Sequence, residues 1–255
     1  MTRPRVVIVQ NSAGSGPGRL PAWLLAQDIG PIFVPGADLP DRFAELVSAT
    51  ARASESPTQA GVDGLVLLGG GFMPDDDERA PFLPRERGLV AEAVDRKVPV
   101  LGICLGAQLL ALVAGGEVTA QSGETERGSC GVELLPPAAD DALFAPLARD
   151  GDTELRMIQN HQDSITALPP GAVHLATSAA CRIQAFRVEE AAWGVQFHPE
   201  AAAAKLADWN ETMLAEQGYD HAALLAQAEA DDAVNTRQAR TLVAAFADVV
   251  RERAR

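Results

Sequence analysis

Short apolar runs alternate with amphipathic stretches through the first half of the chain, and this alternation restricts the possible folds most strongly. The apolar runs predict strands at Arg5–Gln10, Pro31–Pro35, Gly64–Leu68 and Val98–Ile103. The stretches that separate them predict helices at Leu20–Asp28, Arg42–Ala53, Pro84–Arg96 and Leu105–Ala114. Strands separated by helices imply right-handed crossovers. We therefore expect an α/β fold with a mostly parallel central sheet flanked by helices.

The sequence changes character between Gly116 and Gly194, where the apolar runs shorten and turn residues interrupt them. Strands are predicted there at Asp152–Ile158, Val173–Thr177, Ile183–Val188 and Ala192–Phe197. They suggest a small antiparallel extension packed on the main sheet. The rest of the chain is helical in pattern, with helices expected at Ala202–Gln217, Ala222–Ala230 and Asn235–Arg253. The Ser- and Ala-rich stretch Ala51–Gly61 is interpreted as a mobile insertion.

Composition and charge limit which kinds of partner the protein can bind and in which cellular compartment it is expected. The net charge of −14 argues against a surface that binds nucleic acid or a membrane, because both need clustered Lys and Arg. The apolar run at the N-terminus is too short for a signal peptide, and no segment approaches the length of a membrane span. The three cysteines are widely separated, which argues against a disulfide framework or a cysteine zinc site and favours a cytoplasmic location.

Cys104 stands where the predicted strand Val98–Ile103 runs into the predicted helix Leu105–Ala114. Gly102 and Gly106 lie two residues to each side, and they leave room for a sharp turn that exposes the cysteine side chain. The N-terminus of the helix favours a thiolate at this position. A small buried cysteine without chemistry is the alternative, and it is the common fate of this residue type. The paired glycines favour a nucleophile.

A second segment, Trp193–Glu200, is a predicted strand that ends in His198. Glu200 follows two residues later, and residues two apart on an extended chain point the same way. Its carboxylate can therefore hold one nitrogen of the imidazole and leave the other free to accept a thiol proton. This segment alone fits a structural histidine beside a surface glutamate equally well.

Together the two segments resemble class I glutamine amidotransferases, whose hallmarks are G-x-C-x-G-x-Q and a later H-P-E. Here they stand at Gly102 to Gln108 and at His198 to Glu200. The resemblance extends to the glutaminase-like proteins grouped around GMP synthase, through Gly69-Gly70-Gly71, Glu126-Arg127-Gly128, His161-Gln162-Asp163, Gln184-Ala185-Phe186-Arg187 and Gly194–Glu200. It implies a flavodoxin-like class I glutamine amidotransferase fold. Residues 1–200 would then form the catalytic domain, and residues 201–255 a helical extension packed on the same domain.

The resemblance also implies a role for each matching residue. Cys104 would be the nucleophile, His198 the general base and later the acid, and Glu200 the carboxylate that orients the imidazole. The backbone N–H groups expected to hold a tetrahedral oxyanion belong to Gly70, Gly71 and Leu105. The side chains expected around the substrate are Gln108, which would bind or support the glutamine, Asp163 near its α-ammonium, and His161, which would support that loop. No metal and no organic cofactor would be required.

The implied reaction is hydrolysis of the γ-carboxamide of glutamine through a thioester on Cys104. No segment resembles an ATP-binding synthetase domain, so ammonia would pass to a separate synthetase partner. One alternative is a free-standing hydrolase of γ-glutamyl amides or peptides, which would need a roomier leaving-group pocket, possible at Phe72–Leu83. Another is a catalytically silent regulatory or interaction protein, against which the intact catalytic residues count. The glycine-rich stretch Gly14–Gly18 lacks the lysine of a phosphate-binding loop.

Overall fold

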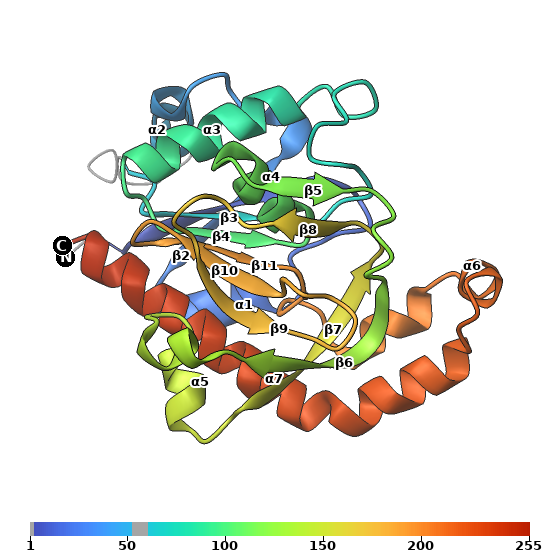
Figure 1. Cartoon of the computed structure of the whole chain (residues 1–255). Helices are drawn as coiled ribbons and strands as arrows, with labels where there is room; N and C mark the ends of the chain where they lie inside the picture. Colours follow the sequence, from blue (N-terminus) through green and yellow to red (C-terminus); the bar gives the residue numbers. More distant parts are fainter. Residues whose placement is uncertain (1–2, 53–60) are drawn as a thin grey trace.

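The computed structural model describes residues 3–52 and 61–255, and a single large sheet runs through it. The nine strands of this sheet are ordered β2-β1-β3-β4-β11-β10-β9-β6-β7 (Figure 1). The first five are parallel to one another: β2 (Gly30–Pro35), β1 (Arg5–Gln10), β3 (Gly64–Leu67), β4 (Val100–Ile103) and β11 (Ala192–Val195). This arrangement confirms the predicted α/β fold class.

The remaining four strands are antiparallel and continue the same sheet. They are β10 (Ala185–Val188), β9 (Val173–Thr177), β6 (Glu126–Leu134) and β7 (Glu154–His161). The expected extension therefore lies beside the parallel strands and not on top of them, because β10 pairs directly with β11. Strand β6 was not predicted, since two glycines and several polar residues hide its alternation. A separate two-stranded sheet pairs β5 (Glu117–Thr119) with β8 (Ser164–Ala167).

Helices cover both faces of the sheet (Figure 1). One face carries α2 (Phe43–Arg52), α3 (Leu83–Asp95) and α4 (Leu105–Val113), and the other carries α1 (Leu20–Ala26), α5 (Ala145–Arg149) and α7 (His221–Arg253). Three short 3-10 helices occupy Gly36–Asp38, Pro136–Asp140 and Ala203–Asp208. Alternate residues of β1 enter the two cores, Val6 and Ile8 on the α7 side and Val7 and Val9 on the α2 side.

The C-terminal segment differs from the expectation of several short helices. A single helix of 33 residues, α7, replaces the two that were predicted beyond residue 221. Residues 231–234 contain neither glycine nor proline, so the helix continues through them. The predicted helix Ala202–Gln217 is broken instead. Asn210 caps the N-terminus of α6 (Glu211–Glu216), because its side chain accepts a hydrogen bond from the Met213 N–H.

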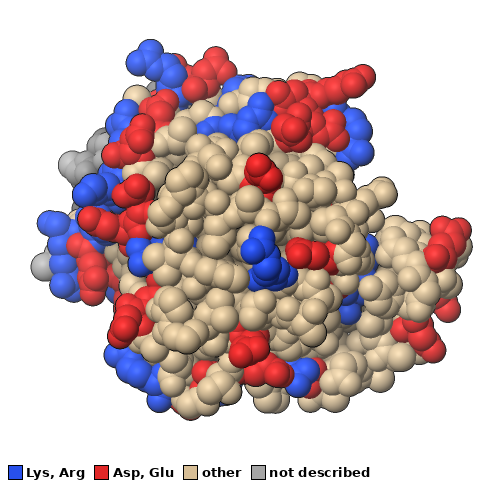
Figure 2. All heavy atoms as spheres, in the orientation of Figure 1, with Lys and Arg blue, Asp and Glu red and all other residues tan. Residues whose placement is uncertain are grey.

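Helix α7 is part of the core, because its residues Leu242, Val243 and Phe246 are buried in the same apolar cluster as the strands. The division into residues 1–200 and 201–255 stays a prediction. Most of the expected insertion, residues 53–60, lies outside the described residues. Within the described ranges no helix is both long enough and apolar enough to cross a membrane. Figure 2 shows acidic and basic side chains interspersed around one face of the molecule.

Candidate active site

The backbone of Cys104 adopts a strained conformation between β4 and α4. Its φ of 51° and ψ of −107° lie in a region that side-chain-bearing residues rarely occupy. Hydrogen bonds on both sides hold it there. The Cys104 N–H donates to the Val195 carbonyl at 2.8 Å, and the Cys104 carbonyl accepts the Gln108 N–H at 3.0 Å. The strand on one side and the first turn of the helix on the other therefore fix the thiol at the end of β4.

The two flanking glycines are required by close backbone contacts. A Cβ atom on Gly102 would lie 2.4 Å from the carbonyl oxygen of Gly106. One on Gly106 would lie 2.3 Å from the carbonyl oxygen of Leu67, in the neighbouring strand β3. Both distances are shorter than any van der Waals contact, and both involve backbone atoms that cannot rotate away. The helix can pack against the strands at this angle only without these side chains.

Replacing Gly106 with alanine is expected to destabilise the fold by about 1–3 kcal/mol, the usual cost of forcing extra atoms into a packed site. Urea unfolding followed by circular dichroism measures the change. Gly88 is the matched control, since it lies exposed in helix α3 and a Cβ there meets nothing within 4 Å. Gly88→Ala should be neutral or slightly stabilising. Equal midpoints for Gly106→Ala and the parent protein would contradict the steric account.

His198 and Glu200 lie together at the end of β11. The Nδ1 atom of His198 is 2.7 Å from Oε1 of Glu200. The side chains are 13% and 6% exposed, so this contact is largely shielded from water. The His198 N–H donates to the Ile158 carbonyl in β7 at 2.8 Å, and the Glu200 carbonyl accepts the Arg19 N–H at 3.0 Å. The backbone bonds hold the two residues in place, and the contact with the Glu200 carboxylate fixes the orientation of the His198 imidazole ring.

The electrostatic surroundings favour a positively charged His198. Burial disfavours the imidazolium, but the carboxylate of Glu200 and the side chain of Cys104 outweigh it and raise the pKa of His198 well above its usual value. A Cβ atom on Gly69 would lie 3.1 Å from Cε1 of His198 and 3.6 Å from Cβ of Cys104, so the two side chains flank one point of the backbone. The Nε2 atom of His198 is buried and has no well-formed hydrogen bond to any described residue. It is free for proton transfer.

A cavity of about 180 Å³ opens beside Cys104. It is lined by residues of five separate segments, which include the predicted site residues Gly70, Gly71, Gln108, His161 and Asp163. The glycine loop also contacts the elbow, since a Cβ on Gly70 would lie 2.6 Å from Cδ2 of Leu105. The structure thus brings the predicted glycine-loop and substrate residues to one cavity beside the Cys104 thiol.

The predicted substrate residues are also bonded to one another. Nε2 of Gln108 donates to the Asp163 carbonyl at 3.1 Å and to Oε1 of Gln196 at 3.3 Å. Oδ1 of Asp163 accepts the Gln121 N–H at 2.8 Å. Gln108 therefore supports the loop that carries Asp163, and Asp163 braces that loop as well as facing the cavity. Its contact with a substrate ammonium stays a prediction.

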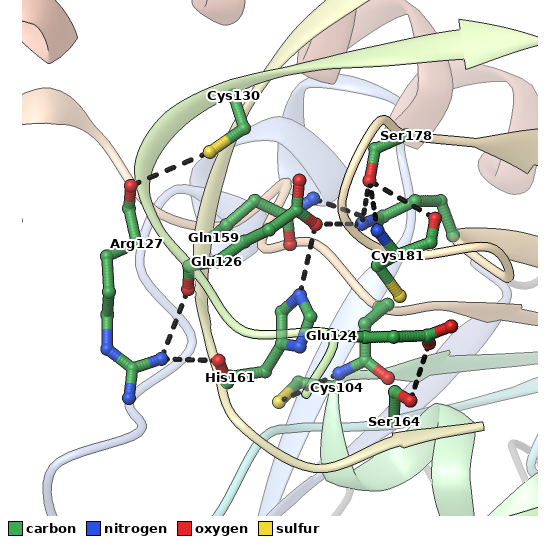
Figure 3. A network of polar contacts seen from close by, with 12 residues as sticks. Cys104, Glu124, Glu126, Arg127, Cys130, Gln159, His161, Ser164, Ser178 and Cys181 are labelled. Carbon is green, nitrogen blue, oxygen red and sulfur yellow. Dashed lines mark hydrogen bonds and ion pairs between the residues drawn. The ribbon is translucent and has the colours of Figure 1, made fainter. Parts of the chain in front are cut away.

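His161 lines the cavity and belongs to a buried polar network (Figure 3). Its Nε2 atom lies 3.3 Å from Oε2 of Glu126, and only 1% of its side chain is exposed. Gln184 donates to the same carboxylate oxygen, and Gln159 donates to Gln184 at 2.8 Å. Arg127 donates to the His161 carbonyl. These contacts agree with a supporting role for His161.

The ligand-type atoms of Glu126, His161 and Cys181 lie within 4.8 Å of one another, a grouping with the donor types of a metal site. Hydrogen bonds already engage all three side chains, and the Cys181 thiol donates to the Ile183 carbonyl at 3.7 Å. Burial, followed by the nearby glutamates, raises the pKa of Cys181, which keeps it in the poorly ligating thiol form. Burial likewise raises the pKa of Cys130 to about 12. The absence of a metal requirement stays a prediction.

Gln196 is a site residue that the sequence analysis missed. It is 1% exposed, and its Nε2 atom donates to the Cys104 sulfur at 3.6 Å. It precedes His198 by two residues, so the same alternation that relates His198 to Glu200 would have placed it at the site. The amide dipole of Gln196 stabilises negative charge on the sulfur.

Asn11 and Glu86 form a second unpredicted support, beneath the glycine loop. The Nδ2 atom of Asn11 donates to the Leu68 carbonyl at 3.0 Å and to Oε1 of Glu86 at 3.1 Å. Glu86 is fully buried, and burial raises its pKa to about 7. Asn11 therefore holds the chain at the entrance to Gly69–Gly71. A lone glutamate in an amphipathic helix carries no sequence signal for such a role.

Comparison of the chain with models of known protein families gives a match that includes Cys104, His198 and Glu200. The family described as glutamine amidotransferase class-I matches residues 43–210. The chain belongs to the class-I glutamine amidotransferase family. The matched range contains the elbow, the glycine loop and the His198–Glu200 pair. Membership confirms the predicted family and the predicted class of enzyme.

Curated relatives of this amidotransferase include glutamine-hydrolyzing GMP synthase subunits. The one from Haloarcula marismortui is 38% identical over 147 residues, which are 57% of this chain and 68% of that protein. The one from Methanocaldococcus jannaschii is 31% identical over 160 residues, 62% of this chain and 76% of that protein. The match to the glutamine-hydrolyzing GMP synthase of Shewanella oneidensis is 36% identical and spans 54% of this chain but only 25% of that protein.

Solved structures extend the similarity to almost the whole chain. A glutamine amidotransferase from Thermotoga maritima has a TM-score of 0.77 and 26% identity, over 97% of this chain and 100% of that one. A glutamine amidotransferase from Methylobacillus flagellatus gives the same score and identity, over 98% and 96%. These alignments extend beyond the family match at residues 43–210 and include most of the C-terminal segment.

Proposed function

We propose that this protein hydrolyses the γ-carboxamide of glutamine through a thioester on Cys104 and passes the ammonia to a separate synthetase partner. The observation that carries the proposal is the strained Cys104 elbow beside a buried, carboxylate-oriented His198. The similarity of the chain to GMP synthase subunits that are named as glutamine-hydrolyzing supports both glutamine as the substrate and a synthetase as the partner. All three cysteines are free thiols, which supports a cytoplasmic location. We propose no nucleic-acid or membrane partner.

The reaction proceeds in two stages on these residues. The Cys104 thiolate attacks the γ-carbonyl carbon, and the oxyanion accepts hydrogen bonds from the backbone N–H groups of Gly70, Gly71 and Leu105. The C–N bond then breaks, and the imidazolium of His198 protonates the departing nitrogen to release ammonia. In the second stage His198 removes a proton from water, which attacks the thioester to release glutamate and restore the thiolate. Glu200 holds the imidazole in position during both stages.

The proposal is tested with the purified chain and glutamine. Release of glutamate and ammonia in equal amounts is expected, together with labelling of Cys104 by a glutamine analogue that carries an electrophilic diazoketone. Transfer is tested by adding the candidate synthetase protein, whose product should form from glutamine with the intact chain and only from ammonium salts with Cys104→Ala. A chain that neither releases glutamate nor reacts with the analogue, alone or with that synthetase, would rule the function out.

Replacing Asp163 with asparagine is expected to raise the KM for glutamine about tenfold or more. The change keeps the size of the side chain but removes the charge that faces the substrate α-ammonium, and a charged hydrogen bond is worth about 1.5–3 kcal/mol. Steady-state kinetics measure the effect. Because the amide oxygen of the new side chain can still accept the Gln121 N–H, the brace observed for Asp163 survives the substitution. An unchanged KM would show that Asp163 only braces its loop and does not bind the substrate.

A further inference from the structure

A second hollow borders the catalytic histidine outside the Cys104 cavity. It has a volume of about 350 Å³, and its walls are the loop of residues 13–19, the pair His198 and Glu200, and residues 201–209. Asn160 lines both this hollow and the Cys104 cavity, so the two spaces adjoin. The sequence analysis suggested Phe72–Leu83 as the wall of a leaving-group pocket. Of that range, Phe72 lines the Cys104 cavity, and its role toward a leaving group stays a prediction.

The wall formed by residues 13–19 is fixed against the catalytic segment. A Cβ on Gly18 would lie 2.1 Å from the Glu200 carbonyl oxygen, so only glycine allows this approach. The Arg19 side chain donates to the Ala201 carbonyl at 2.5 Å and to Oδ1 of Asn235 at 2.7 Å. Ser15 lies near the glycine loop, because its Oγ is 3.8 Å from the position that a Cβ atom on Gly69 would occupy.

In the proposed reaction the leaving group lies on the side of the site where His198 stands. The glutamyl part of the substrate occupies the Cys104 cavity, and the departing nitrogen must face His198 to receive its proton. A substituent on that nitrogen would extend past His198, and the adjoining hollow is the space that His198 lines. Ammonia has the size of a water molecule, which needs a cavity of only about 10–15 Å³. A hollow of 350 Å³ is far larger than ammonia requires.

We propose that the site also hydrolyses γ-glutamyl amides of amino acids, with the amine part held in this hollow. This inference rests on the Cys104 thioester chemistry proposed above. The thiolate bonds to the γ-carbonyl carbon and the C–N bond breaks. The electron pair stays on nitrogen, His198 supplies the proton, and a free amino acid leaves. Water then hydrolyses the same thioester to glutamate, so no further reactant is needed.

The lining suits a leaving group with a carboxylate. Lys205 lies at the exposed edge of the hollow, and its ion pair with Asp208 at 3.2 Å is exposed on both sides and therefore weak. Its ammonium is thus available to an anion. Trp209 supplies apolar surface to the same hollow, and Asn160 and Ser15 supply polar groups. A cation, an apolar surface and polar groups in one hollow suit an amino acid that is attached through its nitrogen.

Filling the hollow tests the inference. Gly16 lines it, a Cβ there would meet nothing within 4 Å, and its backbone does not require glycine. Gly16→Leu is expected to lower kcat/KM for γ-glutamylalanine by about tenfold or more, the scale of steric discrimination in a pocket, with glutamine changed less than about twofold. Gly14→Leu, in the same loop, provides a second variant. Gly88→Leu, exposed in helix α3, is the remote control and should leave both substrates unchanged.

Release of alanine from γ-glutamylalanine by the purified chain, with this selective loss, would support the inference. It is overturned if the protein hydrolyses glutamine but leaves γ-glutamylalanine intact, or if folded Gly14→Leu and Gly16→Leu lower both activities equally. Failure of the proposed function gives a different result, because then neither compound releases glutamate and the diazoketone does not label Cys104.

Discussion

Cys104→Ala is expected to abolish glutamine hydrolysis, with a loss on the order of 10⁴-fold or more, since triad members act as a unit and no other group can form the thioester. The fold should remain, because alanine fills most of the same buried position. Glutamate release and intact-mass detection of the thioester measure the loss. Cys104→Ser is expected to be equally inactive, because a hydroxyl is a far weaker nucleophile than a thiolate.

The other two thiols provide matched controls for this prediction. Cys130→Ala and Cys181→Ala should keep most of the activity, because burial raises the pKa of both groups and keeps them protonated. The strain at position 104 offers an independent check. Cys104→Gly should be more stable than Cys104→Ala by roughly 1–3 kcal/mol, since glycine adopts a φ of 51° without steric cost. A dead but folded Cys130 or Cys181 variant would show that the nucleophile is misassigned.

His198→Asn is expected to be nearly inactive, with a loss approaching that of Cys104→Ala, because asparagine can neither accept the thiol proton nor return it to the leaving nitrogen. Glu200→Gln should keep more activity, since its amide oxygen can still accept a hydrogen bond from Nδ1 and orient the ring. Comparison of kcat and kcat/KM for the two variants gives the separate contributions of the base and of the carboxylate that orients it.

The pH dependence separates orientation from charge. The carboxylate of Glu200 raises the pKa of His198, so Glu200→Gln should lower that pKa. The imidazolium needed to protonate the departing nitrogen is lost as pH rises through the His198 pKa. The upper limb of the pH–rate profile should therefore move to lower pH in Glu200→Gln. An unshifted limb, or a His198→Asn variant with ordinary activity, would remove His198 from the proposed role.

The sequence alone determined four of the five parallel strands and the position of the elbow. The fifth, β11, was predicted as part of the antiparallel extension, and only its pairing with β4 makes it parallel. The four strands and the elbow depend on short-range physics, because strand and helix periodicities and the steric effect of glycine act over a few residues. Gly102 and Gly106 indicated a sharp turn before any partner was known, and the structure shows the backbone oxygens that make them necessary. The spacing of His198 and Glu200 likewise predicted a contact that depends only on the local alternation of an extended chain.

Other features required the tertiary structure, because they depend on segments far apart in the chain. Strand β6 is polar and glycine-containing, so only its pairing with β7 makes it a strand. The donation from Gln196 to the Cys104 sulfur joins residues 92 positions apart. The hollow beside His198 lies between the N-terminal loop and residues 201–209, and no pattern in either segment encodes the space between them. Local patterns indicated the candidate reacting groups, whereas long-range packing decided how much room surrounds them.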